Sequence, residues 1–469
     1  MRSTPRPYSA AALDRLRSAF AGDLVLPSDE GYEDARRVWN AMIDRRPALI
    51  ARPTSVDDVV TALRFGRDAG LTIAVRSGGH SVAGYATCDD GLVIDMSRMR
   101  GVSVDPDRRI ARANGGAFLS ELDVAGQEHG LVCPIGVVGH TGVAGLTLGG
   151  GVGRLQRKFG LTIDSLRSVE LVTADGRRVR AGRDENEELF WGIRGAGANF
   201  GIVTAFEFDL HVFGPTVRRG LWVYPIDRVH EVWGLFDAMI SAASNDLAAS
   251  FNLGPATPVA EFPESVAGRP VVMIGATHAG DEAAAARDIR PLLAAEPPVM
   301  GGAFEASTYL DVQGANDEVF GWGQRVYTKG GFTNGLRPAT LDALAAHVDD
   351  AIGENGIALL AQGGVMAELD EADSAFTGRS ARYHSQCESY WADPADDGAH
   401  IAWTRRGMDI LDSDAAVGRY VNMLTDTDPA LLRSVYGDAK MARLVAIKRA
   451  WDPDNVFRLN QNIDPNSAT

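Results

Sequence analysis

The sequence predicts an α+β protein made of two lobes, and three observations support this prediction. With 469 residues, the chain is longer than a domain with a single hydrophobic core usually is. Short β-like runs alternate irregularly with helical patterns, unlike the regular βαβ array of a parallel-sheet protein. The 52 glycines, about eleven per cent of the chain, gather in a few segments and exceed the usual ~7%. Two lobes that hold a large ligand between them fit both the length and the glycines.

The first half of the chain is predicted to contain helices and short strands in mixed order. Apolar positions at helical spacing predict helices over 9–21, 32–44, 55–69 and 118–129. β-like runs between turn residues predict strands over 71–75, 91–96, 101–105 and 109–116. A hairpin over 165–181 turns at Asp175-Gly176, and a strand over 201–210 closes this lobe.

The pattern changes near residues 211–215, where a second sheet backed by helices is predicted. Its first elements are a strand over 218–226, a helix over 228–243, a strand over 270–280 and an alanine-rich helix over 281–294. The segment from Met441 to Pro465 begins as a helix and need not belong to the lobe that precedes it.

Composition excludes several classes of function. The 62 acidic and 46 basic residues give a net charge of -16, which opposes nucleic-acid binding. No apolar run approaches the ~18 residues of a membrane span, and the N-terminus lacks the apolar core of a secretory signal. The three cysteines have neither a disulfide framework nor the paired spacing of a metal site. We therefore expect a cytoplasmic protein without a bound metal and without nucleic-acid or membrane partners.

The first glycine-rich motif is Arg76-Ser77-Gly78-Gly79-His80-Ser81, which follows the predicted strand over 71–75. Adjacent glycines let successive backbone N–H groups converge on an anion such as a phosphate. A tight turn that carries a surface histidine is the alternative.

The second motif extends from Cys133 to Gly153 and contains eight glycines. Each glycine costs about 0.5–1 kcal/mol relative to alanine in regular structure, so this density favours backbone that passes close to a flat ligand. The alternative is a flexible loop, but the interleaved Val137, Val138 and Val143 favour ordered backbone.

The third motif, over 195–201, has the spacing G-x-G-x-x-x-G between a predicted helix and a predicted strand. The Rossmann fingerprint is G-x-G-x-x-G between a strand and a helix. The segment is therefore a nucleotide-like site in another fold.

Five strings together resemble the FAD-linked oxidases of the vanillyl-alcohol oxidase (PCMH-type) fold, in the berberine-bridge-enzyme-like branch. They are RSGGHSVAGY, GVAGLTLGGGVG, KFGLTIDSL, ELFWGIRGAGANFGIVT and DPDNVFRLNQNI. The resemblance covers the chain from about Arg46 to Pro465. It implies a PCMH-type two-subdomain FAD-binding lobe over 1–212 with its core over 46–212, an inserted antiparallel-sheet substrate lobe over 213–432, and a C-terminal segment over 433–469 that returns to the first lobe.

The resemblance also implies FAD as the cofactor. The loop Arg76 to Ser81 would bind its pyrophosphate, and His80 matches the histidine joined to the flavin 8α-methyl group. Further implied FAD contacts are Val137, Gly142, Gly145, Gly149, Gly150, Gly197, Asn199, Gly201, Val203, Asn460 and Asn462. Cys133 matches the cysteine that forms a second flavin bond in bicovalent members, although its spacing to His140 is one residue short. The alternative is a free, buried cysteine.

The catalytic base of many relatives is the last tyrosine of Tyr-x-Asn-Tyr, and here the string is Tyr420-Val421-Asn422-Met423. Methionine accepts no proton, so that mechanism does not transfer, which favours amines or already acidic hydroxyls as substrates. Asn422 is a candidate hydrogen-bond donor to the substrate.

Two runs, 357–366 and 381–391, are predicted to be antiparallel strands of the substrate lobe. Period-2 alternation places Leu360 and Gln362 on one face of the first run. In the second run it places Arg382, His384 and Gln386 on one face, with Tyr383 and Cys387 off it. His384 is the candidate general base because its ordinary pKa of ~6.5 lies near working pH; a surface histidine is the alternative. Gln362 is a candidate substrate hydrogen-bond donor.

The predicted function is an FAD-dependent oxidase. It would take a hydride from a C–H next to N or O of a small molecule, pass it to flavin N5 and then to O2, and release H2O2. The alternatives are a dehydrogenase with another acceptor, a non-catalytic flavin- or ligand-binding protein, and a non-flavin nucleotide-binding protein. A monomer or a homodimer in secondary metabolism is expected.

Overall fold

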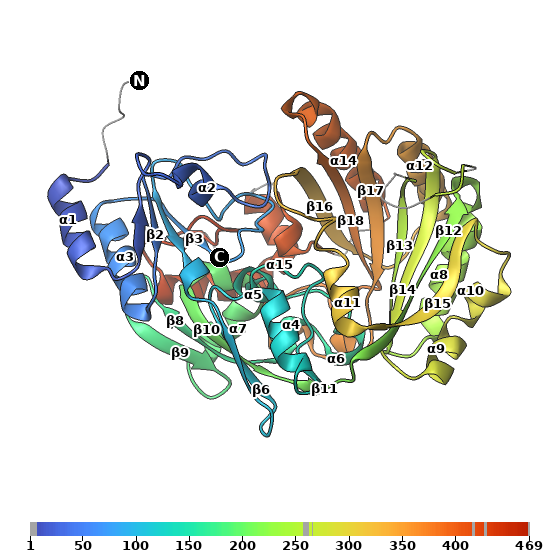
Figure 1. Ribbon diagram of the computed structural model, residues 1–469, viewed down its shortest axis with the longest axis horizontal. Coiled ribbons are helices and arrows are strands. Elements are labelled where there is room, and N and C mark those ends of the chain that lie inside the picture. Colours follow the sequence, from blue (N-terminus) through green and yellow to red (C-terminus); the bar gives the residue numbers. More distant parts are fainter. Residues whose placement is uncertain (1–6, 257–261, 265, 415–417, 426–428, 468–469) are drawn as a thin grey trace.

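The computed structural model shows two lobes side by side along the longest axis of the molecule (Figure 1). It describes residues 7–256, 262–264, 266–414, 418–425 and 429–467. The first lobe combines the N-terminal half of the chain with the C-terminal helix, and the second lobe is built around one large sheet. The two-lobed α+β fold predicted from the sequence is confirmed. The predicted lobe boundaries at 212 and 432 remain predictions.

A four-stranded sheet in the order β1-β2-β4-β3 begins the first lobe. Its strands are β1 (Asp23–Val25), β2 (Leu49–Arg52), β3 (Ile73–Arg76) and β4 (Leu92–Asp95). β3 and β2 run parallel to β4, while β1 is antiparallel to β2. The sheet is covered by α1 (Ala10–Ala19), α2 (Tyr32–Arg36) and α3 (Val56–Asp68). Since the motif Arg76 to Ser81 begins at the last residue of β3, this sheet sets where that loop starts.

A five-stranded antiparallel sheet in the order β5-β6-β10-β8-β9 forms the second part of this lobe. The strands are β5 (Val102–Asp105), β6 (Ile110–Asn114), β8 (Leu166–Val172), β9 (Arg178–Gly182) and β10 (Ile202–Asp209). The helices of the first lobe that follow β6 in the chain are α4 (Leu119–Gln127), α5 (Val143–Leu148), α6 (Gln156–Phe159), α7 (Glu187–Ala196) and α15 (Pro429–Trp451). Two short strands, β7 (Leu131–Val132) and β11 (His211–Val212), pair with each other.

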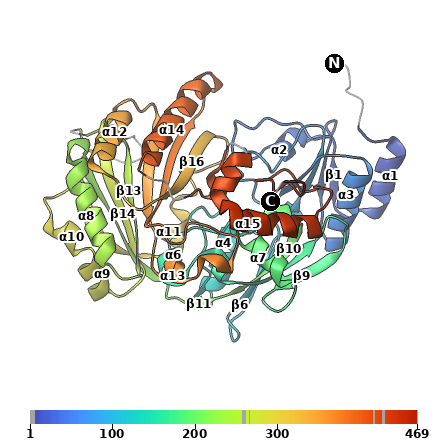
Figure 2. The same cartoon turned by 180° about the vertical axis from the view of Figure 1, so that it is seen from behind.

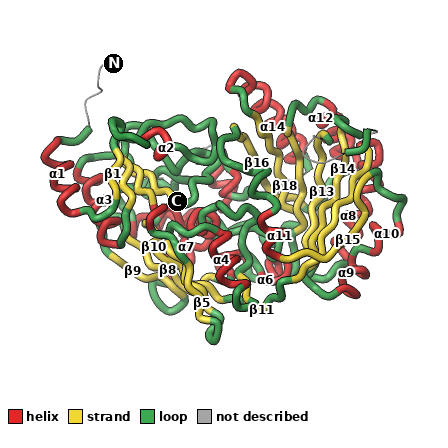
Figure 3. Tube along the Cα trace, in the orientation of Figure 1, coloured by secondary structure: helices red, strands yellow, loops and turns green. Residues whose placement is uncertain are grey.

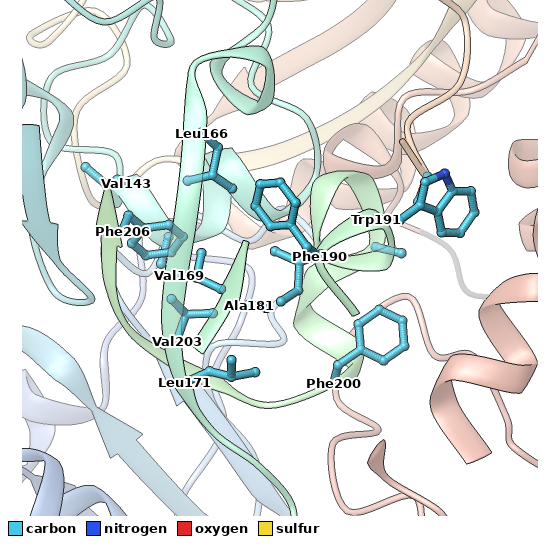
Figure 4. Close-up of a cluster of buried hydrophobic side chains, with 14 of the residues drawn as sticks. Val143, Leu166, Val169, Leu171, Ala181, Phe190, Trp191, Phe200, Val203 and Phe206 are labelled. Carbon is cyan, nitrogen blue, oxygen red and sulfur yellow. The ribbon is translucent and has the colours of Figure 1, made fainter. Parts of the chain in front are cut away.

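The core of this lobe lies between the five-stranded sheet and its helices. Figure 4 shows Phe190 of α7 near Leu166 and Val169 of the sheet, while Trp191 of the same helix points away from them. The same cluster includes buried side chains of α15, although α15 follows the entire second lobe in sequence. Figure 2 shows this helix lying against the first lobe. Apolar burial therefore returns the C-terminal segment to the first lobe.

The second lobe is one seven-stranded antiparallel sheet in the order β15-β12-β14-β13-β17-β18-β16 (Figure 3). The strands are β12 (Thr216–Pro225), β13 (Leu247–Pro255), β14 (Pro270–His278), β15 (Met300–Thr308), β16 (Arg325–Thr333), β17 (Glu354–Ala361) and β18 (Tyr383–Trp391). Its helices are α8 (Val229–Ala242), α9 (Glu282–Asp288), α10 (Arg290–Ala294), α11 (Tyr309–Gly314), α12 (Pro338–Asp349), α13 (Val365–Glu368) and α14 (Asp397–Asp412). Side chains of α8, α12 and α14 form one hydrophobic cluster with the sheet.

Two predicted helices differ from the structure. The helix predicted over 32–44 ends at Arg36, because the chain becomes extended at Arg37 and the side chain of Asn40 then hydrogen-bonds the backbone of Val326 in the second lobe. The helix predicted over 281–294 is divided into α9 and α10. Pro291 lies at the start of α10, where its ring and missing N–H prevent a continuous helix.

None of the helices in the described part of the chain has the length and apolar character needed to cross a membrane.

Lys448 of α15 anchors the C-terminal segment. Its side chain is completely buried, and Nζ donates to the carbonyl oxygens of Asn199 (2.8 Å) and Phe457 (2.9 Å) and to Asp452 Oδ2 (2.6 Å). Desolvation lowers the pKa of Lys448. Removing one partner from a buried ion pair leaves the other charge uncompensated.

We expect Lys448→Met to lower the free energy of unfolding by about 3–5 kcal/mol, measured by urea denaturation. Arg443→Met is the control on the same helix, because Arg443 pairs with Glu188 at the surface and such pairs contribute about 1 kcal/mol or less. Equal losses in the two variants would contradict the anchoring role of Lys448.

Candidate active site

A cavity of about 430 Å³ lies between the two lobes, within the ~300–1,000 Å³ range of ligand pockets. The first lobe contributes four segments to its wall, over 77–82, 136–149, 195–203 and 457–461. The second lobe contributes residues of β16, β17 and β18, and the segment over 420–424 completes the wall. Both glycine-rich loops and the sheet of the second lobe therefore face one space.

The two glycine-rich segments touch each other through their backbones. A Cβ added to Gly78 would lie 2.2 Å from the backbone nitrogen of Gly142, and one added to Gly142 would lie 2.3 Å from that of Gly78. Gly79 has a φ of 73°, a conformation that glycine adopts at no steric cost. Only residues without a side chain fit this contact, so it explains the glycines at 78 and 142.

His80 lies between aromatic rings at the wall of the cavity. Its Nε2 is 2.7 Å from His140 Nδ1, and its ring stacks on Trp39 with the centroids 4.9 Å apart. Burial, together with the neighbouring His140, lowers the pKa of His80 to about 3. The imidazole is therefore neutral at working pH and keeps a lone pair that can act as a nucleophile.

Strand β18 supplies the polar side chains of the second lobe. His384, Gln386, Glu388 and Tyr390 alternate along it and all line the cavity. Tyr383 and Cys387 point into the hydrophobic cluster on the opposite face, so the predicted alternation over 383–387 is confirmed. Arg382, expected on the face of His384, does not line the cavity; its Nη2 donates to Ser241 Oγ of α8 (2.7 Å).

Two side chains of this row differ in basicity. His384 is 1% exposed, and neither of its ring nitrogens has a hydrogen-bond partner among the residues described. Burial lowers the pKa of His384 to about 4. Burial has the opposite effect on a carboxyl group and raises the pKa of Glu388 to about 7. Glu388 Oε2 accepts a hydrogen bond of 3.0 Å from Tyr390 Oη.

Asn422 holds the second glycine-rich segment in place. Its Nδ2 donates to the carbonyl oxygen of Leu146 (3.2 Å) and to Tyr420 Oη (3.0 Å). A Cβ on Gly149 would lie 2.1 Å from Asn422 Oδ1. Asn422 lines the cavity, but its amide N–H groups already donate to these oxygens and position the backbone.

A segment of the second lobe ties the two lobes together beside His80. Asp317 Oδ1 accepts a hydrogen bond of 2.5 Å from the backbone of Gly139, and the Asp317 carbonyl lies 3.1 Å from His140 Nε2. The Phe320 carbonyl accepts a hydrogen bond of 2.7 Å from Trp39 Nε1. These contacts fix the loop that carries His140 and the ring that stacks on His80.

Comparison with known proteins identifies the family. Residues 47–182 match the FAD binding domain family, and residues 419–464 match the family described as berberine and berberine like. The chain is 30% identical over 471 residues to (R)-6-hydroxynicotine oxidase of Paenarthrobacter nicotinovorans, with 96% of this chain and 98% of the relative covered. The chain belongs to the berberine bridge enzyme-like family of FAD-linked oxidoreductases.

Solved structures of this family have the same fold. The structure of 6-hydroxy-D-nicotine oxidase from Arthrobacter nicotinovorans superposes with a TM-score of 0.84 at 27% identity, covering 95% of this chain and 98% of that one. Berberine bridge enzyme-like 1 of Physcomitrella patens superposes with a TM-score of 0.88 at 24% identity, covering 98% and 100%.

The cavity fits FAD, the cofactor of this family, on two observations. The contact between Gly78 and Gly142 leaves the wall without side chains, so a flat ligand can approach the backbone. In the described part of the chain, Ser77 Oγ, Asn460 Oδ1 and Gln461 Oε1 are buried without hydrogen-bond partners, although these three residues line the cavity. Buried polar atoms of this kind require a partner, and a polar cofactor supplies one.

Most of the FAD contacts expected from the berberine bridge enzyme-like family line the cavity. These residues are Ser77, Gly78, Gly79, His80, Ser81, Val137, Gly142, Gly145, Gly149, Asn199, Gly201, Val203 and Asn460. Of the expected catalytic residues, His384 and Asn422 line it as well.

Cys133 and Gln362 require correction, because neither is among the residues that line the cavity. Cys133 is 1% exposed in the core of the first lobe, and burial raises its pKa well above the usual range. Both observations favour the free, buried cysteine of the alternative, because a cysteine bonds to a flavin as its thiolate. Gln362 follows the end of β17, where the chain turns at Gly363 with a φ of 95°, so the strand alternation stops before it.

Four other expected FAD contacts are not among the residues that line the cavity. Arg76 is buried, and its Nη2 donates to Asp95 Oδ2 (2.7 Å), so its guanidinium anchors the start of the loop. Cβ atoms on Gly150 and Gly197 would lie 2.4 Å from Phe376 and 2.5 Å from Leu148, so tight packing requires these glycines. Asn462 lies beside the wall residues Asn460 and Gln461 but is not among the lining residues.

Several cavity residues were not found from the sequence. Extending the period-2 pattern of His384 and Gln386 by four residues would have identified Glu388 and Tyr390. Trp39, Phe320 and Thr328 also line the cavity, and they lie in segments without a motif, so no sequence signal marked them. Among the described residues, no group of three or more His, Cys, Asp or Glu side chains is placed to hold a metal ion.

Proposed function

We propose that this FAD-linked oxidoreductase is an oxidase that holds FAD covalently through His80 and oxidises a C–H next to N or O of a small organic molecule. The main support for this proposal is the position of His80. Its neutral imidazole is held by His140 and Trp39 and faces the cavity between the glycine-rich loops and the substrate lobe. When bound, FAD supplies the hydride acceptor at N5 and transfers the electrons to O2, which gives H2O2.

The protein residues of the site bind and orient. The glycine-rich loops and the polar atoms of Ser77, Asn460 and Gln461 would hold the cofactor, while β18 presents polar side chains to the substrate. The buried rings of Tyr420 and Trp39 restrict water at the reacting centre. Gly136 and Val137 both line the cavity and are the two candidates for controlling access of O2.

The available proton acceptors argue for turnover rather than for passive binding. A base works best when its pKa lies near the operating pH. The pKa of His384, at about 4, makes it a weak base, whereas the pKa of Glu388, at about 7, suits proton transfer near neutrality. A non-catalytic flavoprotein would not require such a group in its cavity, and a dehydrogenase with another acceptor differs from the proposal only in the step with O2.

A cytoplasmic location and a role in secondary metabolism complete the proposal. The three cysteines are free and buried, which fits a reducing compartment. Met423 in place of the base tyrosine favours secondary metabolites over simple sugars as substrates. We expect a monomer or a homodimer.

The experiment that tests the proposed function is the absorbance spectrum of the purified protein before and after denaturation, followed by assays for H2O2 with amines and alcohols. We expect a flavin spectrum, flavin that stays with the denatured chain, and substrate-dependent H2O2. A colourless protein that takes up no added FAD would refute the proposal. Flavin reduction without H2O2 would favour the dehydrogenase.

A further inference from the structure

We propose that the substrate is a basic amine that enters as a cation, and that the carboxylate of Glu388 binds this cation and accepts its proton. This inference rests on the proposed function and specifies its substrate class. Three arguments support it: the charge of the cavity wall, the residues around Glu388, and the need for a nitrogen lone pair when an amine loses a hydride.

The cavity offers one charged side chain to a substrate. Among the cavity-lining residues that the structure describes, Glu388 is the only Asp, Glu, Lys or Arg. On the wall formed by β16, β17 and β18, away from the glycine-rich loops that would bind the FAD pyrophosphate, a substrate carboxylate or phosphate would find no Lys or Arg to replace its hydration, and burying an unpaired charge is costly. A substrate with an ammonium group would pair with Glu388. The charge of the wall therefore selects cations over anions.

Glu388 is placed to reach a ligand. In the sheet, Thr328 of β16 lies opposite it on one side and Gly356 of β17 on the other. Gly356 has no side chain to cover the carboxyl group. Thr328 also lines the cavity, and its Oγ1 is buried without a partner within the described residues. A ligand N–H group between Glu388 and Thr328 would satisfy that hydroxyl oxygen.

The groups that face Glu388 leave its charge sensitive to pH near neutrality. They are Tyr390 and Gln386 on its own strand and Thr328 on β16. Farther along the cavity wall the titratable side chains are His80, Tyr85, His384, Tyr420 and Tyr436, and Glu354 of β17 lies opposite Tyr390. Burial raises the pKa of Glu388 to about 7, and the hydrogen bonds from Tyr390 and Gln386 offset part of this effect. The carboxylate form, which binds a cation, is therefore lost as the pH falls below about 7.

Loss of a hydride from the carbon next to nitrogen needs a lone pair on that nitrogen. In the step proposed here, an N–H bond of the ammonium group breaks, the electron pair stays on nitrogen, and the proton forms an O–H bond with Glu388. The neutral amine then loses a hydride from the adjacent C–H and becomes an iminium ion, and the acceptor is the one given in the proposed function. Met423 accepts no proton, so Glu388 takes this role.

The first test measures binding of a cation that cannot be oxidised. Benzyltrimethylammonium is titrated into the protein by isothermal calorimetry between pH 5.5 and 8.5, which needs no turnover. We expect wild-type protein to bind at pH 8 and to lose affinity by ~10-fold or more below pH 6, where Glu388 is protonated; a tenfold loss corresponds to about 1.4 kcal/mol. Glu388→Gln should bind weakly at every pH.

Glu354→Gln is the matched control, because Glu354 is exposed on the neighbouring strand and does not line the cavity. It removes the same charge and should bind like wild type. Equal binding by Glu388→Gln and wild type overturns the inference, as does an equal loss in both variants. Circular dichroism of Glu388→Gln checks its fold, and Glu388→Asp, which keeps the charge, should recover part of the affinity.

The second test compares N-methylbenzylamine with benzyl alcohol on the flavin-loaded enzyme. For the amine, kcat/KM should rise with pH through about 7, and Glu388→Gln should lose this limb and ~10²–10⁴-fold of kcat/KM. An enzyme that oxidises the alcohol but not the amine overturns the inference and leaves the proposed function intact. A protein that holds no flavin overturns the proposed function, and calorimetry of the cation still decides the inference.

Discussion

Replacing His80 with alanine is expected to release all of the flavin when the protein is denatured, whereas wild-type protein should keep it. The reason is that His80 is the neutral imidazole at the cavity wall, placed by His140 at 2.7 Å and by the ring of Trp39. Flavin in the pellet and in the supernatant after acid precipitation measures the result, together with the mass of the intact chain.

Cys133→Ala is the matched control for this prediction. Cys133 is buried in the core of the first lobe and does not line the cavity, so its loss should leave both the flavin attachment and the flavin spectrum unchanged. Covalent flavin in His80→Ala would contradict the role of His80. A changed spectrum in Cys133→Ala would contradict its assignment as a free cysteine.

Replacing Gly78 with alanine is expected to separate the two glycine-rich segments and to abolish flavin binding. The new Cβ would lie 2.2 Å from the backbone nitrogen of Gly142, and backbone cannot rotate away as a side chain can. Overpacking of this kind costs about 1–3 kcal/mol or more. Urea denaturation and the flavin content of the purified variant measure the two effects.

Gly145→Ala is the control for Gly78→Ala. Gly145 also lines the cavity, but no heavy atom lies within 4 Å of its added Cβ. Because Gly145 lies in α5, alanine should raise the free energy of unfolding by up to ~1 kcal/mol. A loss of stability in Gly145→Ala as large as that in Gly78→Ala would show that the contact with Gly142 is not the cause.

Local pattern was sufficient for much of the fold. The hairpin over 165–181 is present as β8 and β9, with Gly176 at a φ of 81°. The segment over 195–201 joins the end of α7 to β10, which is the helix-to-strand order predicted for it. Side chains of β18 alternate between the cavity and the core because successive residues of a strand point to opposite faces. Each of these features depends on residues that are close in sequence.

The site needed contacts that local pattern does not contain. Trp39 and Phe320 are separated by 281 residues, yet a hydrogen bond of 2.7 Å joins them beside His80. In the sequence, Gln362 continues the period-2 pattern of β17. In the structure the chain turns at Gly363, and Gln362 does not line the cavity. Cys133 lies within the glycine-rich segment, but its side chain packs into the core of the lobe.

The sequence by itself determined the two-lobed α+β fold, the family and the segments that build the cavity, since glycine spacing and strand alternation are properties of neighbouring residues. Only the tertiary structure decided which side chains of those segments face the cavity and how basic they are. The pKa values of His384 and Glu388 move in opposite directions through the same cause, burial. Burial disfavours the charged form of each group, and its extent depends on how the two lobes close around the site.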